Sequence, residues 1–268
     1  MILYPNAKIN IGLYIIDKRT DGFHNLQTCF YPVNWLDALE VIEEPAFRFT
    51  STGIHIPGDA NSNLCINVYA AVKEHFDIPS VHIHLHKNIP IGAGLGGGSA
   101  DAAFTLKALN RKFGLGLSDA DMEALVRPIG SDCAFFIKNK PTLAYGRGNE
   151  FEGLNLSLKG YCITMVYPAI EVSTKEAYAG VTPKQPAIPL KEILEQDITN
   201  WKGVLVNDFE ESVFKNHPAL PGIKQQLYEA GALYASMSGS GSCMYGIFKE
   251  APALSFPANY KVWQGLLQ

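Results

Sequence analysis

The chain has 268 residues, of which 47% are hydrophobic and 18% charged, and its formal net charge is −4. This length and composition suit a globular protein with one large or two medium hydrophobic cores. The negative balance argues against a nucleic-acid-binding protein, because such proteins normally carry a basic patch. The five cysteines are odd in number and far apart, which argues against a disulfide framework or a zinc knuckle.

The N-terminal residues carry no basic segment followed by a long apolar one, and nowhere do about 18 apolar residues run together. We therefore expect a cytoplasmic protein that does not span a membrane.

The first part of the chain is predicted to start with a β-hairpin. Residues 9–15 are apolar at every odd position, so a strand there would place Lys8 and Asn10 on the same face. Turn residues follow at 17–22, and a second strand is predicted at 26–33. Further elements are expected in the following order: strands at 38–42 and 47–52, a helix at 63–76, a strand at 81–87 and a helix from about residue 100 to 109.

Residues 92–99 consist of small side chains with a single leucine, and they lie between the predicted strand at 81–87 and the following helix. Glycine permits backbone conformations that bring N–H groups around an anion, and a helix N-terminus adds unpaired donors. With Ser99 as the expected N-cap and Asp101 in the first turn, the segment predicts a phosphate-binding loop rather than a linker.

Two familiar nucleotide-binding motifs do not fit this loop. The dinucleotide-binding pattern needs a second strand that ends in an acidic residue about 20 positions later, and here a second helix is expected instead. The P-loop pattern needs a Lys-Ser/Thr pair after its last glycine, and none follows. A catalytic cation must therefore come from elsewhere in the chain.

The rest of the chain predicts a second group of elements. A helix is expected at 119–126, an apolar run with one acid at 129–137, and strands at 142–145 and 161–167. Helices at 191–196, 205–214 and 223–230 follow, the last with Gly231 as its C-cap, and then two strands at 232–237 and 243–248 joined by a glycine-serine turn. The end of the chain after Phe248 is not assigned.

Each candidate side chain also has an ordinary interpretation. Lys8 could be a solvated surface lysine, and Asp132 could cap a short buried helix rather than accept a proton. His82, His84 and His86 share one strand face, but the outer two would be roughly 13 Å apart, too far for one tetrahedral zinc site. We interpret these histidines as an exposed or interfacial face.

Taken in order, four motifs resemble the GHMP kinases: residues 8–10, 90–100, 130–132 and 237–241. The resemblance implies an α+β fold with two domains. Residues 1–157 would form an ATP-binding domain like that of ribosomal protein S5, and residues 158–268 a ferredoxin-like C-terminal domain. Residues 21–28 and 206–210 further resemble family members that phosphorylate a cytidine diphosphate-linked methylerythritol in the non-mevalonate route to isoprenoids.

The resemblance also implies roles for individual residues. Asp132 would be the catalytic base and Lys8 would stabilise charge at the same hydroxyl. Phe23 would stack on the cytosine, His24 would read its polar edge, and Asn10 and Thr174 would contact the substrate. ATP and Mg²⁺ would be the cofactors, with Ser99 near the metal. The ATP-binding residues would be Asn63, Leu64, Lys87, Pro90, Ile91, Gly92, Ala93, Gly94, Leu95, Gly96, Gly97, Gly98, Ser99 and Ala100.

Departures from the family pattern at Asn6, Ala93, Ala100 and Ser131 leave these expectations little changed, since three exchange one small residue for another. Phe23 stands in place of a frequent tyrosine and lacks its hydroxyl. The alternatives are a kinase for another small alcohol, such as mevalonate or homoserine, a non-catalytic nucleotide-binding protein, or a dinucleotide-dependent oxidoreductase. We expect a monomer or weak homodimer with no nucleic-acid partner.

Overall fold

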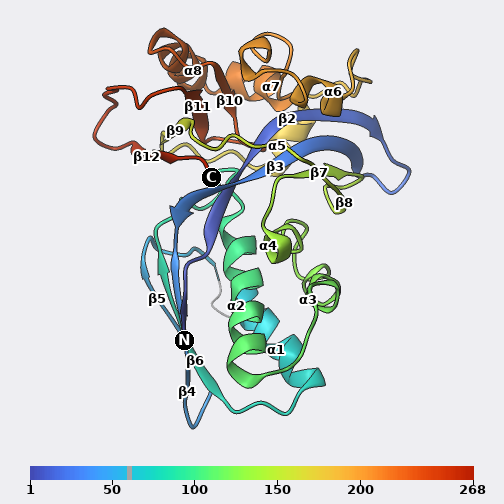
Figure 1. The fold of residues 1–268 in the computed structure, drawn as a ribbon, viewed down its shortest axis with the longest axis vertical. Helices are drawn as coiled ribbons and strands as arrows, with labels where there is room; N and C mark the ends of the chain where they lie inside the picture. The colour runs from blue at the N-terminus through green and yellow to red at the C-terminus, as the bar shows by residue number, and fades with distance from the viewer. Residues whose placement is uncertain (59–61) are drawn as a thin grey trace. The chain divides into compact units, whose positions relative to one another are not determined.

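A computed structural model of the chain describes residues 1–58 and 62–268. The chain divides into two compact units whose segments interleave along the sequence, and Figure 1 follows their elements in chain order. The first unit comprises Met1–Ala7, Trp35–Ile91 and Gly96–Lys140. The second comprises Lys8–Asn34, Gly92–Leu95 and Pro141–Gln268. The expected division between residues 157 and 158 stays a prediction.

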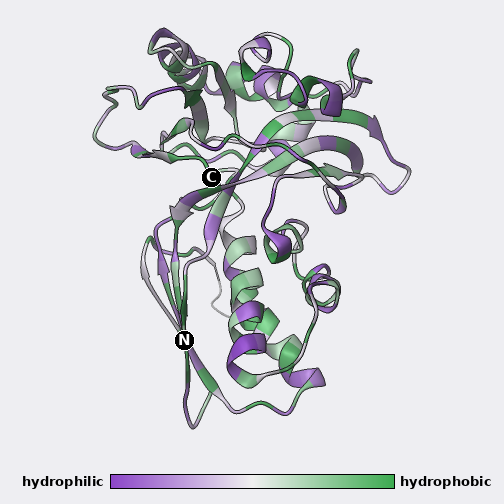
Figure 2. Cartoon of the chain, in the orientation of Figure 1, coloured by the Kyte–Doolittle hydropathy of each residue, from purple (hydrophilic) through white to green (hydrophobic). Residues whose placement is uncertain are grey.

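The first unit is built on a four-stranded sheet covered by helices. Its strands, in spatial order, are β1 (Ile2–Leu3), β4 (Ala38–Glu43), β6 (Val81–Lys87) and β5 (Arg48–Gly53). The helices are α1 (Leu64–His75), α2 (Gly97–Phe113), α3 (Asp119–Val126) and α4 (Phe135–Lys138). Helix α2 packs against α1 and β4, on the face of the sheet to which β6 contributes Val81, Ile83 and Leu85. Figure 2 shows apolar and polar residues mixed along α2, as expected for a helix with one buried face.

The histidines of β6 lie on the opposite face and bond to the neighbouring parallel strand. Thr50 Oγ1 lies 2.7 Å from His82 Nε2 and 2.8 Å from His84 Nδ1. Thr52 Oγ1 lies 3.1 Å from His84 Nε2 and 3.0 Å from His86 Nδ1. These rings therefore link β6 to β5. Within residues 1–58 and 62–268, no cluster of three or more His, Cys, Asp or Glu side chains is arranged to hold a metal ion.

The second unit contains two further four-stranded sheets. One has the order β2 (Asn6–Lys18), β3 (His24–Leu36), β7 (Thr142–Tyr145) and β8 (Glu150–Gly153), with residues 6–7 and 35–36 assigned to the first unit. The other is antiparallel, with the order β10 (Tyr234–Met237), β11 (Met244–Phe248), β9 (Cys162–Tyr167) and β12 (Lys261–Leu266). Its helices are α5 (Thr174–Ala179), α6 (Leu190–Leu194), the 3₁₀ turn η2 (Ile198–Asn200), α7 (Phe209–Asn216) and α8 (Ala219–Glu229).

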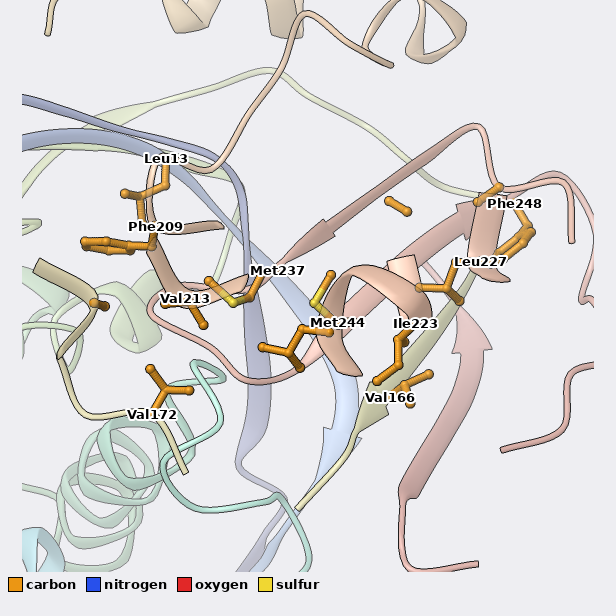
Figure 3. Close-up of a cluster of buried hydrophobic side chains, with 14 of the residues drawn as sticks. Leu13, Val166, Val172, Phe209, Val213, Ile223, Leu227, Met237, Met244 and Phe248 are labelled. Carbon is orange, nitrogen blue, oxygen red and sulfur yellow. The ribbon is translucent and has the colours of Figure 1, made fainter. Parts of the chain in front are cut away.

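An apolar cluster joins these helices to the antiparallel sheet, as Figure 3 shows. Helices α7 and α8 contribute Val213 and Leu227, and the sheet contributes Met237 and Met244, each fully buried. Burying a side chain of this size stabilises a fold by about 1.5–3 kcal/mol. The cluster thereby fixes the strand ends at Met237 and Met244, between which the glycine-serine turn at residues 238–242 runs.

Most predicted elements are confirmed, with differences at their ends. The initial hairpin, the strands at 38–42, 47–52, 81–87 and 142–145, and the helix at 119–126 are all present. The helix predicted at 205–214 was placed too early, because α7 begins only at Phe209. Gly231, with φ +94°, follows the actual C-cap Ala230. The unassigned C-terminal end forms β12. No helix in the described part of the chain is long and apolar enough to cross a membrane.

Candidate active site

The glycine loop runs between β6 and α2 and has glycine where the backbone requires it. Gly92, Gly94 and Gly96 have φ values of +66°, +77° and +67°, a region that residues with a Cβ adopt only at a cost. Between them, Ala93 and Leu95 are each 1% exposed. The loop therefore anchors itself through its two buried side chains. At Gly92 an added Cβ would meet nothing within 4 Å, so the backbone there is bare.

The start of α2 corrects two expectations. The helix begins at Gly97 with Gly96 as N-cap, so Ser99 is not the N-cap, and Asp101 is not in the first turn. The prediction started the helix three residues late, because its first two residues, Gly97 and Gly98, have a low helix propensity. No side chain caps the helix, and its first turn holds no acidic residue. Its amide groups and its positive dipole end fit an anion such as a triphosphate.

Lys8 is buried, so the interpretation as a solvated surface lysine is wrong. The side chain is 4% exposed, and its Nζ donates to Asn10 Oδ1 at 2.6 Å and to the Gly94 carbonyl at 3.1 Å. The ammonium also lies 4.9 Å from the centre of the Phe30 ring. A cation therefore contacts the main chain of the glycine loop itself.

The turn at residues 238–242 supports the same part of the loop. Ser238 Oγ donates to the Gly94 carbonyl at 2.8 Å and accepts from the Asn10 amide at 3.2 Å. A Cβ on Gly94 would come within 1.9 Å of the Ser238 carbonyl oxygen. Asn207 Nδ2 holds the turn by donating to the carbonyls of Met237 and Gly239, each at 2.8 Å. The turn is thus packed directly against the glycine loop.

Asn10 is fully engaged within the protein. Besides accepting from Lys8, its side chain donates through Nδ2 to Thr28 Oγ1 at 2.9 Å, and Thr28 in turn donates to the Gly12 carbonyl at 2.6 Å. Asn10 is 3% exposed. This arrangement orients the Lys8 ammonium, and the expected contact between Asn10 and the substrate stays a prediction.

Asp132 lies in the turn at residues 131–134 that precedes α4, and it is half-buried. The N-cap of α4 is Ala134 and no side chain caps the helix, so the capping interpretation of Asp132 is wrong. Nearby, a Cβ on Gly130 would lie 3.7 Å from Leu64 Cδ1 and 3.7 Å from Ser99 Oγ. The turn that carries Asp132 therefore packs beside the first turns of α1 and α2, all within the first unit.

Two other predicted ATP-binding residues also lie at this end of the first unit. Asn63 caps α1, with its Oδ1 accepting from the Cys65 amide at 2.9 Å, and Leu64 Cδ1 would lie 4.0 Å from a Cβ on Gly98.

Two titratable side chains lie close to these residues. Burial raises the pKa of the Cys133 thiol to about 11, although a hydrogen bond to Ser99 lowers it, so the thiol is protonated at neutral pH. Lys87 is paired with two buried carboxylates.

The predicted cytidine-side residues lie in the second unit, together with two that sequence reasoning missed. Phe23 is 50% exposed at the β2–β3 turn, and the Arg147 guanidinium carbon lies 3.6 Å above its ring. His24 stacks on Tyr178, with ring centroids 4.8 Å apart and an angle of 21°. Thr174 is the exposed first residue of α5. No periodic signal in the sequence links Arg147 or Tyr178 to the hairpin, because both contacts depend on tertiary structure.

Comparisons with known proteins give a consistent result. The chain matches the models of the GHMP kinases N terminal domain over residues 63–140 and the GHMP kinases C terminal region over residues 189–256. It is 54% identical over 253 residues to a 4-diphosphocytidyl-2-C-methyl-D-erythritol kinase of Cytophaga hutchinsonii, covering 94% of each chain. It is 48% identical over 270 residues to the protein of that name in Parabacteroides distasonis, covering 100% of both.

Among solved structures, a crystal structure of a 4-(cytidine 5′-diphospho)-2C-methyl-D-erythritol kinase matches with a TM-score of 0.83 and 28% identity. The match covers 100% of this chain and 99% of that one.

Proposed function

The chain belongs to the GHMP kinases and is an ATP-dependent small-molecule kinase, and we propose that it phosphorylates the 2-hydroxyl of 4-(cytidine 5′-diphospho)-2-C-methyl-D-erythritol. The observation that carries this proposal is the 54% identity, over 94% of both chains, with a relative named as the kinase of that alcohol. Its acceptor would be an intermediate of the non-mevalonate isoprenoid route.

In this proposal the loop at residues 90–100 holds the triphosphate. What supports it is a bare backbone at Gly92, an uncapped helix start at Gly97 and the absence of acidic residues from the first turn of α2. Mg²⁺, when bound, neutralises charge on the phosphate oxygens. Because Mg²⁺ is commonly held by phosphates with few protein ligands, the Ser99 hydroxyl in that same turn is a chemically suitable ligand.

Lys8 and Asp132 would act on the acceptor hydroxyl. Asp132 accepts the hydroxyl proton as the oxygen forms its bond to the γ-phosphorus, and the bond from that phosphorus to the β-phosphate bridge oxygen breaks to release ADP. Lys8 balances the charge that spreads over the transferring group. Its burial and its bond to the Gly94 carbonyl support this role, since a fixed ammonium in a dry site stabilises charge more strongly than a solvated one.

Phe23, His24 and Thr174 would select the cytidine substrate. An aromatic ring that is half exposed offers a face to a pyrimidine base, and the neighbouring imidazole can donate to or accept from the polar edge of that base. The Arg147 guanidinium covers one face of the Phe23 ring and so places a positive charge beside the side chain that would stack on the base.

The test is a transfer assay with purified protein, ATP and Mg²⁺. The cytidine diphosphate-linked methylerythritol should yield ADP and a new phosphomonoester, whereas mevalonate and homoserine, at equal concentration, should yield ADP at less than a hundredth of that rate. Comparable rates with either of the other alcohols would overturn the substrate assignment. Nucleotide binding without transfer to any of the three would favour a non-catalytic protein.

A further inference from the structure

A buried ion network in the first unit consists of Asp37, Lys87 and Asp101. Lys87 ends strand β6, and its Nζ donates to Asp101 Oδ2 at 2.7 Å and also to Asp37 Oδ2. The three residues are each 2–3% exposed. Although burial lowers the pKa of Lys87, its two carboxylate partners raise it by more, so the ammonium keeps its charge. A charge this deeply buried needs such partners.

The network fixes the N-terminal end of the glycine loop through Asp37. The second oxygen of this carboxylate, Oδ1, accepts from the amides of Asn88 and Ile89 at 2.6 and 2.8 Å. The Asn88 side chain adds a bond from Nδ2 to the Leu36 carbonyl at 3.1 Å. Asp37, which also pairs with Lys87, therefore fixes the backbone of the two residues that follow β6.

The network fixes the C-terminal end of the glycine loop, where α2 begins, through Asp101 and Gly97. Asp101 lies four residues after Gly97, on the same face of α2. A Cβ at Gly97 would come within 2.9 Å of Lys87 Nζ and 3.0 Å of Ile89 Cγ2. The first turn of the helix thus rests directly on the ammonium, and Asp101 fastens the next turn to it.

We propose that Asp37, Lys87 and Asp101 are positioning residues, which tie the two ends of the glycine loop together and so fix the main-chain donors that receive the triphosphate. This inference rests on the proposed ATP-dependent function. It assigns Lys87 a different role from direct nucleotide contact, because the ammonium is 3% exposed and two of its three N–H donors go to buried carboxylates. The residues act on ATP only through the backbone that they hold.

The experiment compares Asp101→Ala and Asp101→Asn. Alanine removes the acceptor that fastens α2 to Lys87, so we expect the KM for ATP to rise about tenfold or more, equivalent to about 1.4 kcal/mol, with the KM for the alcohol unchanged within twofold. Asparagine keeps an oxygen acceptor and should restore the KM for ATP to within about threefold of wild type. The pair Asp37→Ala and Asp37→Asn should behave in the same way at the N-terminal end of the glycine loop.

The matched control is Glu43→Ala. Glu43 Oε1 pairs with Lys112 Nζ at 3.0 Å and also links β4 to α2, but at the far end of the helix and with Glu43 57% exposed. Both KM values should stay at their wild-type level. A merely structural effect of Asp101→Ala would lower the amount of active protein and leave the KM for ATP unchanged, and that result would overturn the proposal. A lower KM for ATP would also overturn it, since it would mean that the released Lys87 contacts the nucleotide.

Two further measurements do not depend on turnover, and the second of them needs no variant. Affinity for inorganic triphosphate, measured by calorimetry, should fall with Asp101→Ala by the same factor as that for ATP. If wild-type protein binds triphosphate but transfers nothing, the proposed function fails while this comparison still decides the inference. In wild-type protein, the amides of Asn88 and Ile89 should exchange with deuterium as slowly as those inside β6. If these two amides exchange as fast as those of an exposed loop, Asp37 does not fix this backbone and the proposal is refuted.

Discussion

Replacing Gly94 by alanine perturbs the point where three segments meet. The Gly94 carbonyl accepts from Lys8 Nζ and from Ser238 Oγ, and the backbone adopts φ +77°. An alanine Cβ would lie 1.9 Å from the Ser238 carbonyl oxygen and 2.8 Å from its carbon, both main-chain atoms. The loop and the turn therefore cannot both keep their positions.

The loss in the free energy of unfolding can be estimated by comparison with Gly92→Ala. Gly92 has a similar backbone conformation, but a Cβ there would not meet another segment. Gly92 has φ +66° and an added Cβ would meet nothing within 4 Å, so alanine there pays only the left-handed conformation, about 1–2 kcal/mol. At Gly94 the steric overlap adds about 1–3 kcal/mol, as for an overpacked core. The Gly94 variant should thus lose about 2–5 kcal/mol in its free energy of unfolding.

Urea unfolding of the two variants under the same conditions measures this difference. Activity adds a second readout, because displacing the Gly94 carbonyl by about 1 Å moves the Lys8 ammonium, and a shift of that size at a reacting centre costs on the order of 100-fold in rate. Equal unfolding free energies for the two variants would show that Gly94 is not in contact with the Ser238 turn and would refute this interpretation of the loop.

Two further predictions concern other parts of the chain. Phe23→Ala and His24→Ala should each raise the KM for the cytidine substrate while leaving the KM for ATP within twofold, and equal weakening of both would indicate a structural role. Burial lowers the pKa of Lys107 to about 8, although its Nζ donates to the Phe136 carbonyl at 2.7 Å. In the unfolded chain the Lys107 ammonium keeps its proton up to about pH 10.4, whereas in the folded chain it loses the proton above about pH 8. The stability of wild type relative to Lys107→Met should therefore rise between pH 8 and 10, and a constant difference would contradict the assignment.

The sequence was sufficient for the elements whose periodicity is local. The alternation in β6 and the strongly apolar β9 predict their elements, because local pattern is enough to indicate these strands. Strand β12 was not predicted, since its only support is antiparallel pairing with β9, almost a hundred residues away. The start of α2 was placed three residues late because Gly97 and Gly98 are poor helix formers, and only tertiary contacts, such as those of Gly97 with Lys87 and Ile89, hold them in the helix.

In the candidate site, too, residues within sequence motifs could be predicted, and residues that depend on tertiary contacts could not. The glycine loop, Lys8 and Asp132 were recognisable because their motifs follow one another in a characteristic order. The ion network was not, since Asp37 carries no motif and Asp101 resembled an ordinary first-turn carboxylate. Arg147 and Tyr178 were missed because their contacts with Phe23 and His24 depend on tertiary structure.

A double-mutant cycle of Lys8→Met and Asp132→Asn, measured as kcat with saturating ATP and cytidine substrate, tests most directly whether these two residues act on one hydroxyl. Asp132→Asn alone should lower kcat by at least about 100-fold, the low end for a positioned base. Residues that act as a unit are not additive, so the double variant should be about as slow as the slower single variant. Losses that multiply, or near-normal turnover of Asp132→Asn in folded protein, would contradict the proposed mechanism.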